Sequence, residues 1–113
     1  MNKTERAYYD NGQIWHEVYY KNNKLHREDG PAFIEYRENG TILHEEHFLN
    51  GKRHREDGPA IIQHFEDGKI SAENYYVNGY RHRENGPAKI WYDRYGKISG
   101  EYYYIKGDEI KNE

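Results

Sequence analysis

Histidine and acidic side chains are the residues of this sequence that could bind a metal ion or move protons. The chain of 113 residues contains 7 His and 20 Asp or Glu. His26, His54 and His82 recur at one constant spacing. A metal site needs ligands that converge on one ion at about 2 Å, whereas side chains that recur in register point in parallel. We therefore expect no metal ion and no cofactor, and we expect each histidine to close its loop onto its own hairpin.

Arginine and glutamate also recur in phase, and together they could form ion pairs. A guanidinium group binds a carboxylate through two parallel hydrogen bonds. The pattern predicts a structural ladder of Arg–carboxylate pairs that lock adjacent copies of the recurring unit. The alternative is an arginine patch for an anionic partner. The residues concerned are Arg27, Arg55 and Arg83 together with Glu17, Glu45, Glu73 and Glu101.

Nucleophilic or phosphate chemistry has little support in the sequence. Cysteine is absent, and neither Ser71 nor Ser99, the two serines of the chain, lies in a nucleophile elbow. The dipeptide Gly30-Pro31 and its copies lack the Lys-Ser/Thr of a phosphate-binding loop, so they predict turns. These observations favour a non-enzymatic protein.

The composition is that of a polar but aromatic chain. Hydrophobic residues make up 35% and charged residues 33%, yet 16% are aromatic, with 13 Tyr. Tyrosine can bury its ring while its hydroxyl stays hydrated, so the chain can fold despite its polarity. The net charge of −3 disfavours nucleic acid and anionic membranes as partners. No secretion signal and no apolar run of about 18 residues occur, so we expect no membrane span and a cytoplasmic location, in a bacterium or in a host cell.

An internal repeat with a period of 28 residues organises the whole sequence. The string His-Arg-Glu-Asp-Gly-Pro-Ala occurs at 26–32 and again at 54–60, and a copy with Asn in place of Asp occurs at 82–88. Matches at many positions without a gap are the signature of a repeat architecture. Other positions in phase are Gly12, Gly40, Gly68 and Gly96, and Ile14, Ile42, Ile70 and Ile98.

Each copy reads as two strands and two turns. Residues 32–36 alternate in polarity, Asn39-Gly40 is a strong hairpin signal, and residues 41–49 form the second strand before the turn Asn50-Gly51. The predicted fold is all-β, an antiparallel β-hairpin repeat array forming a single twisted meander sheet, with almost no helix. The predicted organisation is an N-terminal tail at 1–7 and one β-repeat domain at 8–107, with units at about 8–19, 20–47, 48–75 and 76–103 and a partial unit at 104–113.

This pattern resembles the MORN-type repeats. The resemblance covers residues 8–107 and rests on Tyr-Tyr-x-Asn-Gly, then His-Arg-x-x-Gly-Pro-Ala, then Gly-x-x-x-x-Glu. The sequence resembles most a variant with a longer repeat, which is associated with bacteria, phages and large DNA viruses. The resemblance implies an all-β hairpin ribbon used for protein contacts or, in some members, lipid contacts. The usual MORN period is shorter, and the His-Arg-x-x-Gly-Pro-Ala element is not part of the ordinary pattern.

Residues that break the repeat are the candidates for recognition, because the recurring residues suffice for packing. Trp15 stands where later copies have Leu or Ser, and Trp91 stands where earlier copies have Glu or Gln. Such residues could belong to a sheet that coils until both faces are partly covered. They could instead form an aromatic recognition surface on the face of the predicted sheet that lies opposite its core face, since Trp, Tyr and Arg dominate interface hot spots. The predicted partner-binding residues are Trp15, Tyr19, Phe33, Leu49, Tyr75, Val77, Trp91 and Tyr103.

Two functions of different classes follow from these features. The first is a protein-binding repeat module with a partner of unknown identity. The resemblance implies that it could be a phage or viral accessory protein that inhibits a host defence protein. The alternative is a nucleic-acid or nucleotide binder that uses Tyr stacking and an Arg/His ladder. A homodimer formed through a sheet edge or through the aromatic face is a further hypothesis.

Overall fold

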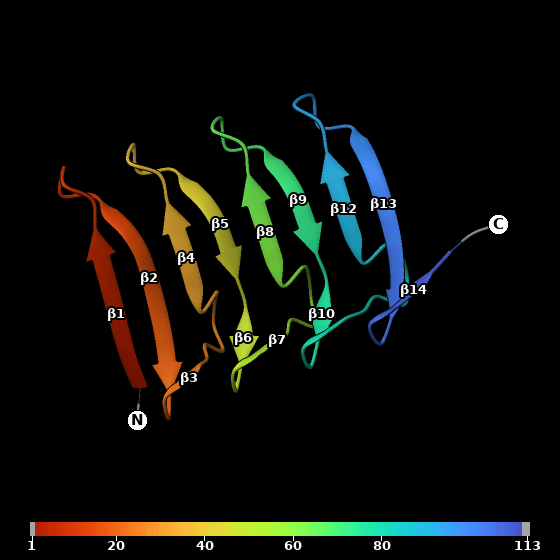
Figure 1. Cartoon of the computed structure of the whole chain (residues 1–113), viewed down its shortest axis with the longest axis horizontal. Coiled ribbons are helices and arrows are strands. Elements are labelled where there is room, and N and C mark those ends of the chain that lie inside the picture. Colours follow the sequence, from red (N-terminus) through yellow and green to blue (C-terminus); the bar gives the residue numbers. More distant parts are fainter. Residues whose placement is uncertain (1, 112–113) are drawn as a thin grey trace.

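The computed structural model describes residues 2–111 as a single antiparallel sheet with short hairpins along one border, and it contains no helix in that range. The prediction of an all-β meander is therefore confirmed (Figure 1). Met1, the first residue of the predicted tail, and residues 112–113, the last of the predicted partial unit, lie outside the described residues.

The strands fall into a long and a short class. The sheet runs in the order β1-β2-β4-β5-β8-β9-β12-β13-β14, and β3 pairs with β2. Its long strands are β1 (Asn2–Tyr8), β2 (Ile14–Lys21), β4 (Phe33–Tyr36), β5 (Ile42–Glu46), β8 (Ile61–His64), β9 (Ile70–Asn74), β12 (Lys89–Tyr92) and β13 (Ile98–Ile105). The short strands are β3 (Lys24–Leu25), β6 (Phe48–Leu49), β7 (Lys52–Arg53), β10 (Tyr76–Val77), β11 (Tyr80–Arg81) and β14 (Asp108–Ile110).

The N-terminal residues belong to the sheet. The sequence predicts a tail at 1–7, but residues 2–8 form β1, which pairs with β2 from Asn2↔Lys21 to Tyr8↔Ile14. The tail boundary is thus wrong for the described residues. The segment has no alternating apolar pattern, so backbone pairing with a neighbouring strand, rather than side-chain burial, holds it in place.

The long hairpins share one register and one irregularity. In β4–β5 the pairs run from Phe33↔Glu46 to Tyr36↔Ile42 and shift between Glu35 and Tyr36. The same shift recurs in β1–β2, β8–β9 and β12–β13. In each case the second strand carries one extra residue, which is a β-bulge. A bulge breaks the strict alternation of faces, so residues before and after it cannot be assigned by counting in twos.

Two kinds of turn separate the strands. At the upper border in Figure 1, a glycine with positive φ closes each turn, as in Tyr9–Gln13, where Gly12 has φ 89°. At the lower border, both central residues take positive φ, as in Asn50-Gly51 (φ 51° and 82°). This is the backbone of a type I′ turn, whose twist matches that of the flanking strands.

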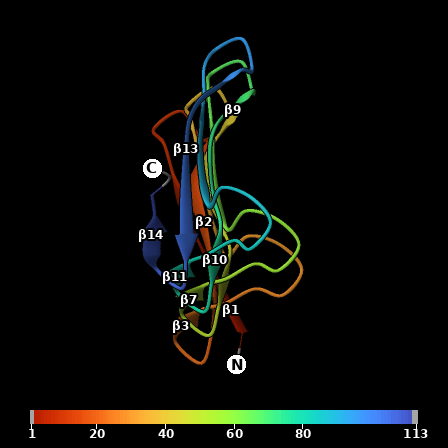
Figure 2. The ribbon, with the colours of Figure 1, turned by 90° about the vertical axis from the view of Figure 1, so that its right-hand side faces the viewer.

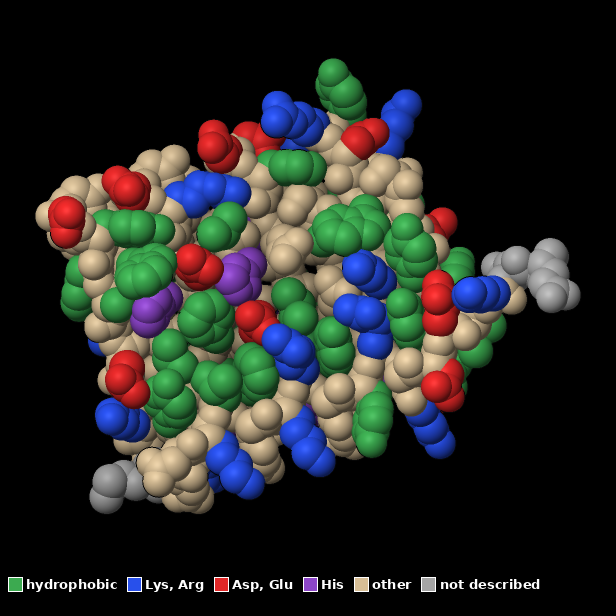
Figure 3. Space-filling view, viewed as in Figure 1, with side chains coloured by type: hydrophobic (Ala, Val, Ile, Leu, Met, Phe, Trp, Pro, Cys, Tyr) green, Lys and Arg blue, Asp and Glu red, His purple; other side chains and the backbone are tan. Residues whose placement is uncertain are grey.

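The molecule is a thin plate with loops on one side. Its extents are 50 × 36 × 17 Å. Figure 2 shows three loops, formed by residues 26–32, 54–60 and 82–88, that project from one face of the sheet. We call this the back face and the opposite one, seen in Figure 3, the front face. The core is small: the buried apolar side chains of the described residues are Val18, Ala32, Ile34, Ala60, Ala72, Ala88 and Ile90.

Candidate functional site

Strand register assigns the side chains of the front face. Residues directly opposite each other on adjacent strands point to the same side of a sheet. One row across the sheet is Val18, Phe33, Glu46, Ile61, Asn74, Lys89 and Tyr102. The next row is His16, Glu35, His44, Gln63, Ala72, Trp91 and Gly100.

An aromatic cluster occupies the N-terminal half of this face (Figure 3). Ring centroids are 6.0 Å apart for Tyr9 and Trp15, 4.8 Å for Trp15 and His16, and 5.9 Å for His16 and Phe33. Trp15 is the bulge residue of β2, and its indole Nε1 donates to Glu35 at 3.2 Å. The bulge therefore turns Trp15 onto the front face, where 42% of the residue stays exposed.

A histidine bridges two carboxylates beside this cluster. His44 lies 5.3 Å from the Phe33 ring centroid, and its Nδ1 and Nε2 atoms lie 3.3 Å from Glu35 and 3.2 Å from Glu46. Arg53 Nε donates to the other oxygen of Glu46 at 2.9 Å. The hydrogen bond with His44 and then that from Arg53 hold the pKa of Glu46 below its ordinary value, against the effect of burial. The front face thus combines apolar rings with fixed negative charge.

A row of alternating aromatic and arginine side chains follows the short hairpins. The Arg53 guanidinium lies 5.6 Å from the Phe48 ring and 5.7 Å from the Tyr76 ring. Arg81 lies 5.3 Å from Tyr76 and 5.0 Å from Tyr104. Such cation–π contacts hold the hairpins together. Sequence reasoning missed Arg53 and Arg81, although each follows an aromatic residue by five positions in consecutive copies.

The second tryptophan lies at the far side of the same face. Lys89 Nζ is 4.8 Å from the Trp91 ring and 5.9 Å from the Tyr102 ring. A Cβ atom at Gly100 would lie 3.2 Å from Trp91 and 3.3 Å from Tyr102, so glycine makes room for both rings. Trp91 is 40% exposed.

The predicted partner-binding residues do not share one face. Trp15, Phe33 and Trp91 are on the front face, whereas Tyr19 and Tyr75 lie on the back face under loop arginines. Arg27 is 4.1 Å from the Tyr19 ring and Arg83 is 4.0 Å from the Tyr75 ring. Of the remaining three, Leu49 and Val77 line hollows between successive loops, and Tyr103 lines a hollow between the last loop and β14. The prediction relied on strict alternation, which the bulge at Trp15 interrupts.

The predicted Arg–Glu ladder is also not what the structure contains. Arg27 Nε donates to Asp29 at 3.1 Å, and its Nη1 donates to the Pro31 carbonyl at 3.2 Å. Arg55 makes the equivalent bonds within its own loop, and Arg83 reaches the carbonyl of Pro87. The loop glycine allows this: a Cβ atom at Gly58 would lie 3.0 Å from Arg55 Cζ. Each arginine thus folds back onto its own loop because that loop reverses the chain beside it.

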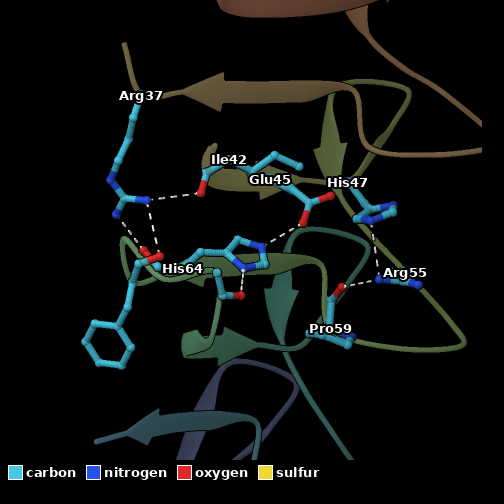
Figure 4. A network of polar contacts seen from close by, with 9 residues as sticks. Arg37, Ile42, Glu45, His47, Arg55, Pro59 and His64 are labelled. Carbon is cyan, nitrogen blue, oxygen red and sulfur yellow. Dashed lines mark hydrogen bonds and ion pairs between the residues drawn. The ribbon is translucent and has the colours of Figure 1, made fainter. Parts of the chain in front are cut away.

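The recurring glutamates bind rings from the following hairpin instead. Glu17 accepts a hydrogen bond from the Tyr36 hydroxyl at 2.7 Å, and Glu73 accepts one from Tyr92. His64 Nε2 takes the equivalent place beside Glu45 at 3.0 Å (Figure 4). The fourth member of the predicted set, Glu101, is exposed.

These contacts shift the pKa values of Tyr36, Tyr92 and Glu17. Burial and the bond to Glu17 raise the pKa of Tyr36 to about 12. Burial and the bond to Glu73 do the same for Tyr92, whose pKa is also about 12. Burial works to raise the pKa of Glu17, but hydrogen bonds from Arg6 and Tyr36 outweigh it and hold that pKa below its ordinary value.

The recurring histidines link each loop to the next hairpin rather than to their own. The backbone N–H of Asn50 donates to His26 Nδ1 at 2.9 Å, that of Asn78 to His54 at 3.0 Å, and that of Lys106 to His82 at 2.9 Å. The expected structural role is thus found with a different partner. Within residues 2–111, no group of three or more His, Cys, Asp or Glu is placed to hold a metal ion, and no helix is long and apolar enough to cross a membrane.

Comparisons of the chain with protein-family models, with curated proteins and with solved structures found no match.

Proposed function

We propose that this chain is a non-enzymatic protein-binding module whose recognition surface is the front face. The observation that carries the proposal is the exposure of both tryptophans, 42% for Trp15 and 40% for Trp91, on the sheet face that bears no projecting loop (Figure 2). Large exposed aromatic side chains beside polar groups are typical of protein contact surfaces.

The chemistry of the front face defines the kind of partner. The cluster around Trp15 and Phe33 fits an apolar patch on the partner. The adjoining Glu35 and Glu46 are acceptors held in place by His44, so they fit hydrogen-bond donors at the border of that patch. The resemblance to MORN-type repeats extends this proposal to a phage or viral accessory protein that inhibits a host defence protein in the cytoplasm.

The test compares tryptophan variants with a matched surface variant. Trp15→Ser and Trp91→Ser remove front-face rings, while Tyr95→Ser removes a ring that is 86% exposed in a turn at the sheet border. Partners are captured from a lysate of the native host, identified by mass spectrometry and purified for affinity measurement. We expect a tryptophan variant to lose a partner that Tyr95→Ser retains, with an unchanged melting temperature. A lower melting temperature without a binding defect would show that the tryptophans serve packing alone.

A nucleic-acid or nucleotide binder is the alternative. The arginines and histidines that it would use already make hydrogen bonds within the protein. Arg27 and Arg55 donate within their own loops, and His26 and His54 accept from backbone N–H groups. Phosphate binding through freed arginines would weaken steeply with salt. Fluorescence anisotropy with a labelled single strand at low and high salt distinguishes the two functions, because salt-sensitive binding would favour the alternative.

A further inference from the structure

We propose that a second copy of this chain docks against the outer edge of β1 through the outer edge of its own β13, so that the sheet continues head to tail. Among residues 2–111, β1 pairs with β2 alone, and residues 98–102 of β13 pair with β12 alone. The other long strands pair on both sides. This inference is independent of the proposed function, because the contact uses the sheet edges and leaves the front face open.

The interior of the sheet supplies the register for this contact. Strands β2 and β4 pair as His16↔Glu35, Glu17↔Ile34 and Val18↔Phe33. The same register recurs between β5 and β8 and between β9 and β12. In sequence phase, β13 corresponds to β2 and β1 corresponds to β4. The same register between copies places Gly100, Glu101 and Tyr102 of one copy opposite Ala7, Arg6 and Glu5 of the other. The contact ends there, because β14 already pairs with residues 103–105 of β13, and residues 2–4 of the docking copy must bend away from that edge.

The side chains at the two edges complete a contact that the interior already contains three times. Glu17, Glu45 and Glu73 each meet a ring that lies 19 positions later in the chain. Glu101 is the fourth glutamate of this series, and it is exposed without a side-chain partner among the described residues. Tyr8 stands in phase with Tyr36 and Tyr92 and is 59% exposed. Docking brings the Tyr8 hydroxyl of one copy to the Glu101 carboxylate of the other.

Charge favours the same arrangement. The interior rows place an isoleucine between two glutamates, as with Ile34 between Glu17 and Glu45. In β1 the equivalent residue is Arg6, whose Nε donates to Glu17 at 2.7 Å while its side chain remains 44% exposed. Glu101 of the second copy would lie on the other side of Arg6. The attraction between a cation and two flanking carboxylates is stronger than that between a cation and one carboxylate.

The opposing possibility is that β1 protects the sheet edge. Charged residues on an edge strand discourage pairing with other chains, and Lys3 and Glu5 are exposed there. That arrangement predicts a monomer at all concentrations. A head-to-tail contact uses two different surfaces of each copy, so it generates open chains or rings rather than a closed two-fold dimer. The two cases therefore differ in how particle size depends on concentration.

Cross-linking tests the register directly, because the chain contains no cysteine. Glu5→Cys and Tyr102→Cys variants are purified separately, mixed, oxidised with glutathione disulfide and separated without reductant. We expect a disulfide-linked dimer in the mixture, well above the level in either variant alone. Tyr95→Cys replaces Tyr102→Cys in the matched control and should give no such band. An equally strong dimer band in the Tyr95→Cys control or in Glu5→Cys alone would overturn the proposal. The absence of a dimer band from the mixture of Glu5→Cys and Tyr102→Cys would also overturn it.

Sedimentation velocity tests the charge contact without cysteine. The unmodified chain should sediment faster as its concentration rises. Glu101→Lys places the new lysine against Arg6 of the other copy. About tenfold more protein should then be needed for the same increase in sedimentation rate. Glu66→Lys makes the same charge change in an exposed turn and should behave like the unmodified chain. A chain that stays monomeric throughout, or equal behaviour of both variants, contradicts the proposal, and circular dichroism verifies that both variants fold.

Discussion

At the scale of single residues, three of the four recurring glutamates, Glu17, Glu45 and Glu73, hydrogen-bond a ring of another hairpin. Each of these three is half-buried or buried beside its ring, and the ring comes from the next hairpin. Hydrogen bonds to a charged acceptor are stronger than neutral ones, and a buried carboxylate without a donor would destabilise the fold. The glutamates that the sequence pattern pairs with arginines thus connect adjacent hairpins.

Tyr36→Phe tests this role through its pH dependence. We expect the free energy of unfolding near neutral pH to fall by about 1 kcal/mol, because Glu17 loses a donor. The pKa of Tyr36 is raised to about 12, so the folded state holds this proton more tightly than the unfolded state does. The stabilisation is complete below about pH 10, the ordinary tyrosine pKa, and is lost as the pH rises through the folded-state value.

Urea unfolding of both proteins at neutral and at alkaline pH measures this difference. The gap between the unmodified chain and Tyr36→Phe should narrow at alkaline pH. Tyr95→Phe, which alters an exposed ring, controls for general effects of losing a hydroxyl. A gap that does not change with pH would show that the Tyr36–Glu17 contact is not the cause.

At the scale of elements, the loop motif His-Arg-x-x-Gly-Pro-Ala stabilises its own loop and also contacts the next turn. Its arginine bonds within the loop, its glycine leaves room for that arginine, and its alanine is fully buried, as Ala60 shows. Its histidine accepts from the next turn, as His54 does from Asn78. Hairpins too small to be stable alone can thus support one another.

His54→Phe tests the link between a loop and the next turn. The ring keeps its approximate size but cannot accept the hydrogen bond from Asn78 N–H. We expect the free energy of unfolding to fall by about 1–2 kcal/mol, the cost of a backbone donor left without an acceptor. Glu66→Gln, an exposed change in a turn at the opposite border of the sheet, should have little effect. Equal stability of the two variants in urea would exclude this role for the histidine.

At the scale of the whole molecule, stability is distributed along a thin plate, so a local weakness can affect the entire sheet. His47 is such a weakness: it occupies the place of Tyr19 and Tyr75 on the back face. Its Nε2 lies 3.3 Å from Arg55 Nη1. Burial and the nearby Arg55 lower the pKa of His47. The folded state thus favours neutral His47, and protonation places a second cation beside Arg55.

This arrangement predicts which pH range destabilises the protein first. A histidine with a lowered pKa contributes stability above its ordinary value of about 6.5, and that stability is lost as the pH falls through the folded-state value. The lowered pKa values of Glu17 and Glu46 act later, because their stabilisation is lost below the ordinary glutamate value of about 4.3.

His47→Tyr should flatten the first part of this acid dependence. The variant restores the residue found at the equivalent positions and removes the titrating group. The reverse change, Tyr75→His, places a histidine beside Arg83 and should steepen the dependence. Melting temperatures measured between about pH 7 and about pH 5 check both variants. Parallel curves for all three proteins would show that this position does not govern acid stability.

The all-β class, the meander and the positions of the turns follow from the sequence alone. The repeat period, the Asn-Gly and Asp-Gly turn signals and the alternation of polarity are local features of the sequence. Neighbouring residues produce them in the same way in every copy. The sequence also indicated that His26, His54 and His82 are structural, although not that their partner lies in the next hairpin.

Which residues meet, and on which face of the sheet, depends on how the strands pair and the loops run. The bulge at Trp15 shifts the alternation by one residue, so Trp15 joins Phe33 on the front face while Tyr19 lies on the back. Arg27 reaches its own loop rather than Glu17, because the loop path brings Asp29 and the Pro31 carbonyl closer. A bulge and a loop path are properties of the paired and packed chain, and a spacing read along one copy contains neither.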